Sequence, residues 1–100
     1  MLKRLFKDDH PDIASSLNNI GGSHSHLGNQ EMALEYYLKS LEMYKRLFKK
    51  DHLNIASSLN NIGASYSHLG NQDMALEYYM QSLEMRKRLF KEDHPDIASS

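Results

Sequence analysis

The 100-residue sequence contains no cysteine, tryptophan, valine or threonine. Without cysteine, the chain has no disulfide framework, no cysteine-bound zinc and no thiol nucleophile. Valine and threonine favour strands, so their absence beside 14 leucines predicts an all-α fold. The sequence also lacks a run of about 18 apolar residues and an N-terminal secretory pattern. We therefore expect no membrane span and an intracellular, cytoplasmic protein.

The charges nearly balance, since 12 basic and 13 acidic residues give a formal net charge of −1. This balance argues against a strongly basic nucleic-acid binder. Basic pairs such as Lys45-Arg46 and Lys87-Arg88 recur near the C-terminal ends of expected helices, where cations favour the helix dipole. A basic ridge that touches RNA or membrane phosphates is the rival interpretation, and it would require steep salt dependence. We expect neither a nucleic-acid nor a membrane partner.

The sequence repeats itself with a period of 42 residues. Residues 1–42 and 43–84 differ at nine positions, and residues 85–100 match residues 1–16 at 14 of 16 positions. Both ends of the chain therefore fall inside a unit. This pattern is typical of a piece cut from a longer array, or of a chain built from one repeat.

Each unit predicts two antiparallel helices. Pro11 suits the first helical position, Gly28 the left-handed residue after the helix, and Asn29 the N-cap of the next helix. Only Gly28 and Asn29 separate the two helices, so the helices fold back on each other. One apolar face of the first helix is made of Ile13, Leu17, Ile20, Gly21, His24 and Leu27.

The second helix is expected over residues 30–48. Its charged side offers the i,i+4 pairs Glu35–Lys39 and Glu42–Arg46. Its apolar arc contains Ala33, Tyr36, Tyr37, Ser40, Leu41, Tyr44, Leu47 and Phe48. The same pattern predicts one domain over residues 1–100, with a partial helix at 2–7, hairpins at 11–48 and 53–90, and a partial helix at 95–100. A lone hairpin leaves its apolar stripe open, so we expect the units to stack as a right-handed α-solenoid.

These positions resemble the tetratricopeptide repeat, most closely its 42-residue kinesin-light-chain type. The resemblance rests on Leu17, Ile20, Gly21, Gly28, Ala33, Tyr37 and Leu41, with counterparts at Leu59, Ile62, Gly63, Gly70, Ala75, Tyr79 and Leu83. The sequence departs from the pattern at Leu17, where the family usually has Trp, at His24, where it has Tyr, and at Ser40, where it has a small apolar residue.

The resemblance implies a protein–protein interaction scaffold that binds a peptide on the concave wall of its first helices. By position, the wall consists of Ser15, Asn18, Asn19, Gly22, Ser25, His26, Ser57, Asn60, Asn61, Ala64, Ser67 and His68. Amides suit peptide groups because they donate and accept hydrogen bonds. The alternative for Asn18 and Asn19 is a bond to the adjacent helix, or simple exposure to water. The alternative for the whole chain is an excised or idealised repeat with a structural role and no ligand of its own.

No residue set indicates catalysis, a cofactor or a metal site, so we expect a non-enzyme. His24 and His26 point about 200° apart on a helix and cannot chelate one ion together. His24 replaces Tyr66 of the next unit, which favours a packing role. His10, His52 and His94 follow Asp in the connections, which favours a capping or loop role.

Two forms of homo-oligomer are expected from the sequence. Both ends of the array expose surfaces that a neighbouring unit would cover, which predicts end-to-end stacking. In addition, Leu53 replaces the proline found at positions 11 and 95. Loss of that helix stop would let residues 48–55 stay helical, so that hairpins exchange between chains around Leu53.

Overall fold

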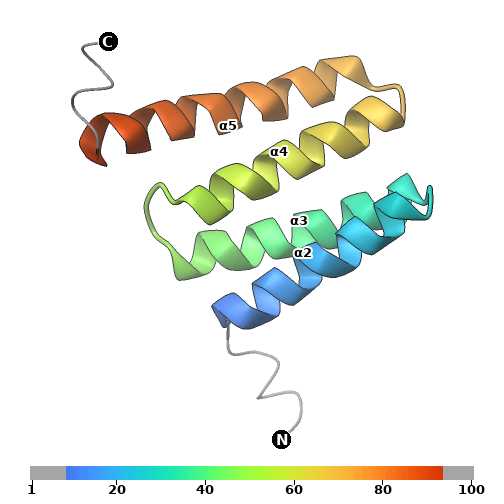
Figure 1. Cartoon of the computed structure of the whole chain (residues 1–100), viewed down its shortest axis with the longest axis horizontal. Helices are drawn as coiled ribbons and strands as arrows, with labels where there is room; N and C mark the ends of the chain where they lie inside the picture. Colours follow the sequence, from blue (N-terminus) through green and yellow to red (C-terminus); the bar gives the residue numbers. More distant parts are fainter. Residues whose placement is uncertain (1–8, 94–100) are drawn as a thin grey trace, which may run out of the picture.

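The computed structural model describes residues 9–93, which form four helices that stack in chain order (Figure 1). The helices are α2 (Pro11–His26), α3 (Gln30–Leu47), α4 (Leu53–His68) and α5 (Gln72–Asp93). Each packs against the next, and residues 9–93 contain no strand. The all-α, helical-repeat fold is therefore confirmed. The partial helices expected at 2–7 and 95–100, together with His94, lie outside the described residues.

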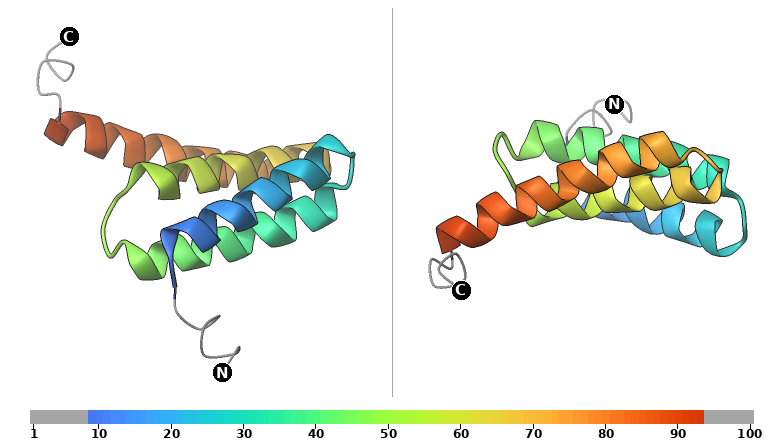
Figure 2. Two further views of the ribbon diagram at one scale, coloured as in Figure 1. Left: turned by 60° about the horizontal axis from the view of Figure 1, so that its bottom comes forward. Right: turned by 90° about the horizontal axis from the view of Figure 1, so that it is seen from above.

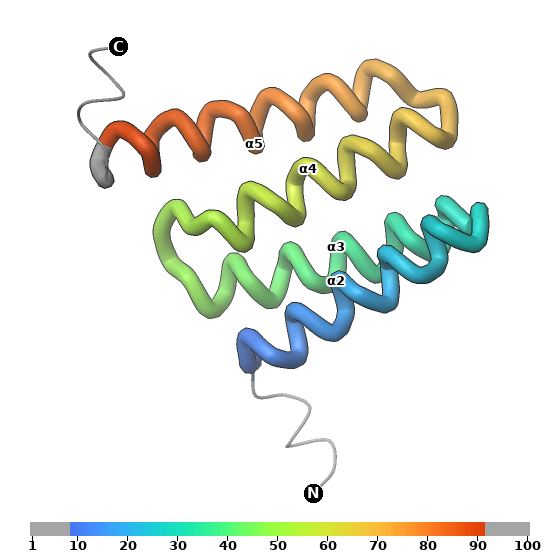
Figure 3. Tube along the Cα trace, viewed as in Figure 1, coloured from blue at the N-terminus to red at the C-terminus, as the bar shows by residue number. Residues whose placement is uncertain are grey.

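Each hairpin turns at a glycine in the left-handed conformation. Gly28 has φ of 86° and Gly70 has φ of 88°. After α2, the Gly28 N–H donates to the Ser25 carbonyl at 3.0 Å and the Asn29 N–H donates to the His24 carbonyl at 2.8 Å. This Schellman arrangement satisfies the last carbonyls of the helix and reverses the chain within two residues. The expected antiparallel pairs follow from it, as the trace in Figure 3 shows.

Histidines cap the first helix of each hairpin. The Asp12 N–H donates to His10 Nδ1 at 3.0 Å, and the Asn54 N–H donates to His52 Nδ1 at the same distance. The expected capping role of these histidines is confirmed. Asn29 stands at the N-cap of α3, but its side chain makes no cap hydrogen bond, contrary to expectation. Its counterpart does cap α5, since Asn71 Oδ1 accepts the Met74 N–H at 3.2 Å.

The chain leaves the helical conformation between the two hairpins although no proline stands there. Phe48 has extended backbone angles, so α3 ends at Leu47, one residue before the expected boundary. The Phe48 ring stacks on the His52 ring at a centroid distance of 3.8 Å, and α4 then begins at Leu53. In α5 the helix continues to Asp93 instead of the expected residue 90, because no such turn intervenes within the described part. Exchange around Leu53 stays a prediction.

In each hairpin a tyrosine ring packs against a glycine of the facing helix. A Cβ atom added to Gly21 would lie 2.8 Å from the Tyr37 ring and 3.1 Å from the Ala33 carbonyl oxygen. Gly63 meets Tyr79 and Ala75 in the same way. Glycine is therefore required here to bring the two helices together.

A buried serine ties each hairpin at a second level. Ser40 is fully buried, and its hydroxyl donates to the Ala14 carbonyl oxygen at 2.7 Å. Ser82 donates to the Ala56 carbonyl at 2.8 Å in the second hairpin. The repeat pattern has a small apolar residue at this position. The serine found here bonds to the facing helix, and this hydrogen bond offsets the cost of burying its hydroxyl.

An ion pair closes the open end of each hairpin. Arg46 donates to both carboxylate oxygens of Asp9, at 2.7 and 3.1 Å, and Arg88 holds Asp51 at 2.6 and 3.2 Å. The expected Glu35–Lys39 pair forms at 3.5 Å. The expected Glu42–Arg46 pair does not form, because Arg46 binds Asp9 instead. A bidentate bond between arginine and a carboxylate is stronger than an exposed ion pair along one helix.

The first helix buries less of its apolar face than the pattern predicts. Ile20 is 41% exposed and Leu27 is 81% exposed, whereas Ile62, the counterpart of Ile20 in α4, is fully buried. The difference has a simple cause, since α4 lies between α3 and α5 while α2 lies at one end of the stack (Figures 1 and 2).

We predict that Gly21→Ala destabilises the protein by about 1–3 kcal/mol, because the new methyl group overlaps the Tyr37 ring. Gly22→Ala is the matched control, since its Cβ would meet only the Tyr37 hydroxyl at 3.7 Å and unit two already has Ala64. The control should gain about 0.5–1 kcal/mol from helix propensity. Urea unfolding followed by circular dichroism measures both, and equal stabilities for the two variants would contradict the packing account.

Acid should weaken the hairpins through their ion pairs. The Arg46 guanidinium lowers the pKa of Asp9 below its ordinary value of 3.8, and Arg88 lowers the pKa of Asp51. A carboxylate whose pKa is lower in the folded than in the unfolded protein stabilises the folded state. This contribution is complete at a pH above the ordinary pKa of 3.8, and it is lost as the pH falls through the pKa of the folded state. The double variant Asp9→Asn/Asp51→Asn should therefore lose less thermal stability than the parent below that pH. If the melting temperatures of the variant and the parent fall equally with decreasing pH, this assignment is wrong.

Candidate functional site

The residues expected on the wall lie on α2 and α4, the first helices of the two hairpins. Six of the twelve are exposed, namely Ser15, Asn19, His26, Ser57, Asn60 and His68, and the other six are half-buried. Gly22 and Ala64 lie between them at half-buried positions. The wall is therefore a row of polar side chains with a small residue at the centre of each helix.

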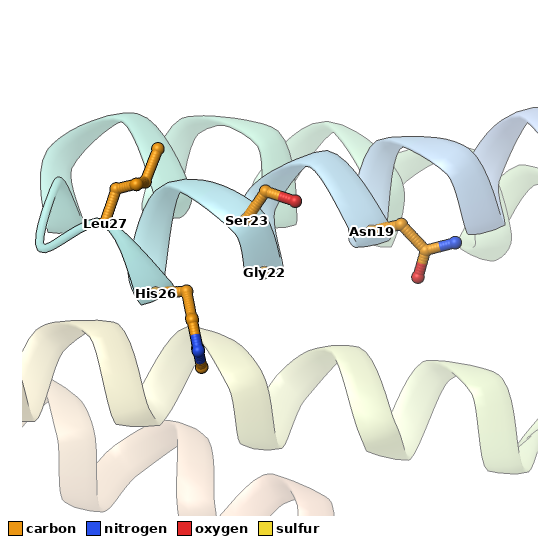
Figure 4. Close-up of a pocket in the computed structure, with 5 residues that line it drawn as sticks. All are labelled: Asn19, Gly22, Ser23, His26 and Leu27. Atoms are coloured by element: carbon orange, nitrogen blue, oxygen red, sulfur yellow. The ribbon is translucent and has the colours of Figure 1, made fainter.

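Three wall residues, Asn19, Gly22 and His26, line one hollow in the surface, together with Ser23 and Leu27 (Figure 4). Figure 4 shows Asn19 and His26 leaving the same side of α2, while Leu27 points away from them. Ser23 and Leu27 belong to the end face of the stack, so the hollow straddles the wall and that face. Sequence reasoning did not place these two residues on the wall, because the wall was assigned by position in the repeat and they lie on a neighbouring face of α2.

Asn18 and Asn61 bond to each other between α2 and α4. The Asn61 Nδ2 group donates to Asn18 Oδ1 at 3.2 Å, and both side chains are half-buried. For Asn18 the alternative interpretation, a bond to an adjacent helix, therefore holds. Asn19 and Asn60 occupy the corresponding positions but are exposed, with no side-chain hydrogen bond within residues 9–93.

Glutamines at the start of the following helices form hydrogen bonds with Ser25 and Ser67. Gln30 Nε2 donates to the Ser25 carbonyl at 3.3 Å and to its hydroxyl at 3.2 Å. Gln72 repeats both contacts with Ser67, at 3.3 and 3.4 Å. These two serines therefore stiffen the turn of each hairpin and leave fewer groups for a ligand.

The electrostatics of the wall are nearly neutral, because none of its residues is Lys, Arg, Asp or Glu. The Tyr37 hydroxyl lies near Gly22, and burial raises the pKa of this phenol above its ordinary value. The cations lie elsewhere, and Arg46 and Arg88 of the basic runs are held by Asp9 and Asp51. The wall thus presents hydrogen-bonding groups without a fixed charge.

The histidine expected to pack does so. His24 stacks on Tyr36 with ring centroids 5.6 Å apart, and Tyr66 stacks on Tyr78 at 5.7 Å in the second unit. Within residues 9–93, no three His, Asp or Glu side chains gather in an arrangement that could hold a metal ion. In the same range, no helix is long and apolar enough to cross a membrane.

A second groove is lined by residues of α3, α4 and α5, away from the expected wall. Its lining residues are Lys45, Leu59, Met80, Gln81, Glu84, Met85 and Arg88. Sequence reasoning missed it because the groove joins helices from different units, and helical periodicity describes only one helix at a time.

The repeated hairpins and the polar wall define a helical-repeat scaffold. The family model for the tetratricopeptide repeat matches residues 1–46, 12–88 and 54–100, which together span the chain. The chain therefore belongs to the tetratricopeptide repeat family, whose members are non-enzymatic scaffolds that mediate protein–protein interaction. A search of curated proteins finds no significant match.

We predict that Asn18→Ala and Asn61→Ala each destabilise the protein by about 0.5–1.5 kcal/mol, because each removes a half-buried hydrogen bond. The double variant should cost no more than either single variant, since the same bond is lost only once. Asn19→Ala is the exposed control and should be neutral within about 0.5 kcal/mol. Chemical unfolding of the four variants gives the comparison, and fully additive losses would show that the two amides are not coupled.

Proposed function

We propose that this chain holds an extended peptide segment of a partner protein on the wall formed by α2 and α4. The observation that carries the proposal is the row of exposed amide and imidazole groups on these helices, at Asn19, His26, Asn60 and His68. Two of these groups, Asn19 and His26, line one hollow with Gly22 between them, and polar groups placed around a hollow can fix a ligand's orientation.

The chemistry of the wall favours the backbone of an extended segment as the ligand. An amide offers two donors and two lone pairs, so Asn19 and Asn60 match peptide N–H and C=O groups. Gly22 and Ala64 let the ligand backbone approach the helices closely. The wall contains no Lys or Arg, so it lacks the cationic groups that would clamp a C-terminal carboxylate.

The period and the long second helices support a finer assignment to the kinesin-light-chain type of repeat. The α5 helix is 22 residues long, and the period is 42 residues. We propose that the two hairpins belong to one repeat domain that spans residues 1–100.

A purely structural role is the second candidate function, and a specific observation favours it. Four wall residues already bond within the protein, since Asn18 pairs with Asn61 while Ser25 and Ser67 hold glutamines. In this case the remaining wall groups face only water.

A peptide-display selection on the full chain separates the two functions. The counter-selection target is the variant Asn19→Ala/His26→Ala/Asn60→Ala/His68→Ala, which spares the internally bonded Asn18 and Asn61. We expect a shared extended motif that loses at least about tenfold in affinity on this variant, since each removed group supplies a contact to the ligand. Fluorescence anisotropy with a labelled peptide of that motif gives the affinities.

The matched control is Glu42→Ala/Lys87→Ala, two exposed positions on the second helices. It should bind the peptide as the parent does. Enrichment of no motif on a target that circular dichroism shows to be folded would overturn the peptide proposal and favour the structural role.

A further inference from the structure

An apolar stripe on α5 is open within the described residues. Leu76, Met80 and Leu83 are 59%, 51% and 53% exposed. Their counterparts on α3 are Leu34, Leu38 and Leu41, of which the first two are half-buried and the third is 5% exposed. The α3 residues owe this burial to α4, which packs against α3 as the next helix of the stack.

At the opposite end of the stack, α2 exposes the equivalent of the surface that α4 packs against α3. On α4, Ser58, Ile62 and Ser65 are almost fully buried. On α2 the same residue types, Ser16, Ile20 and Ser23, are all exposed. The chain therefore carries both halves of its own α3–α4 interface, one at each end (Figure 1).

The asparagines repeat this relation. In the interior of the stack, Asn61 donates to Asn18 of the preceding unit. Asn60 is the counterpart of Asn18 at one end, and Asn19 is the counterpart of Asn61 at the other. A second copy in the same register would bring its Asn19 to Asn60 of the first, and one such bond leaves the other donors and acceptors of each amide available.

We propose that α5 of one copy docks on α2 of a second copy, in the register in which α3 packs on α4. The stripe Leu76, Met80 and Leu83 would cover Ile20 between Ser16 and Ser23, whose small side chains allow a close approach. Because the two faces differ, the contact is heterologous, and further copies add in an open series instead of closing a symmetric dimer.

One difference makes this junction weaker than the internal one. Arg86 stands on α5 where α3 has the buried Tyr44, and its guanidinium Nε donates to Ser82 Oγ at 3.4 Å. A charged side chain at the edge of the junction opposes burial. Association is therefore expected to rise steadily with concentration rather than to be complete at low concentration.

The test uses the full chain and two variants that each block one face. Ile20→Glu leaves the α5 stripe intact, and Leu83→Glu leaves the α2 face intact. Both positions are exposed, so the fold should persist, which circular dichroism and thermal unfolding verify. Gln81→Glu adds the same charge to an exposed position on the other side of α5 and serves as the matched control.

Sedimentation velocity over a concentration series should give growing oligomers for the parent and the control. Each blocked variant alone should weaken association at least about tenfold, since a buried unpaired charge at an interface centre is costly. An equimolar mixture of the two blocked variants should form a dimer that stops at two chains, because only one intact pair of faces remains.

Three results would overturn the proposal. A mixture that stays as monomeric as its components would exclude complementary faces. A parent that is a monomer at every concentration would leave residues 94–100, whose sequence is that of residues 10–16, as the other occupant of the α5 stripe. The variant Leu53→Pro leaves both end faces unchanged. If it abolishes the oligomer, the oligomer forms by hairpin exchange around Leu53 and not by end-to-end docking.

Discussion

The close approach of Tyr37 to Gly21 is the contact on which the rest of the structure depends. It lets α2 and α3 lie near enough for the Ser40 hydroxyl to reach the Ala14 carbonyl across the same interface. The hairpin formed in this way offers the outer surface of α3 to the next unit, and α4 packs against that surface. A larger residue at position 21 would push the helices apart, and the buried serine would lose its acceptor.

Repetition makes the environment of a residue depend on its neighbours as much as on its own helix. Ile20 and Ile62 occur in nearly identical sequences, yet one is exposed and the other is fully buried. Asn19 and Asn61 differ in the same way, since within residues 9–93 only Asn61 has an asparagine of a preceding hairpin to bond. In such a quasi-one-dimensional fold, the same residue is buried or exposed according to whether a neighbouring unit packs against it.

The sequence predicts what short-range physics controls. Gly28 and Pro11 mark the turn and the helix start, His52 caps, and His24 stacks as its tyrosine counterpart does. Contacts between distant residues escape the pattern. Arg46 prefers Asp9, 37 positions away, to its helical neighbour Glu42, and the bond between Asn18 and Asn61 requires the packing of two units. The wall residues could be placed on a face, but which of them bond internally depends on that packing.

The most direct measurement for this account is the proton NMR spectrum of the full chain, read at the two tyrosine–glycine contacts. The account predicts strong nuclear Overhauser effects from the Tyr37 ring to Gly21 and from the Tyr79 ring to Gly63, because each ring lies within van der Waals contact of its glycine. It also predicts that the Hα resonances of both glycines are shifted by the ring current. Contacts missing in both hairpins, or present in only one, would contradict the claim that a single repeated interaction builds the fold.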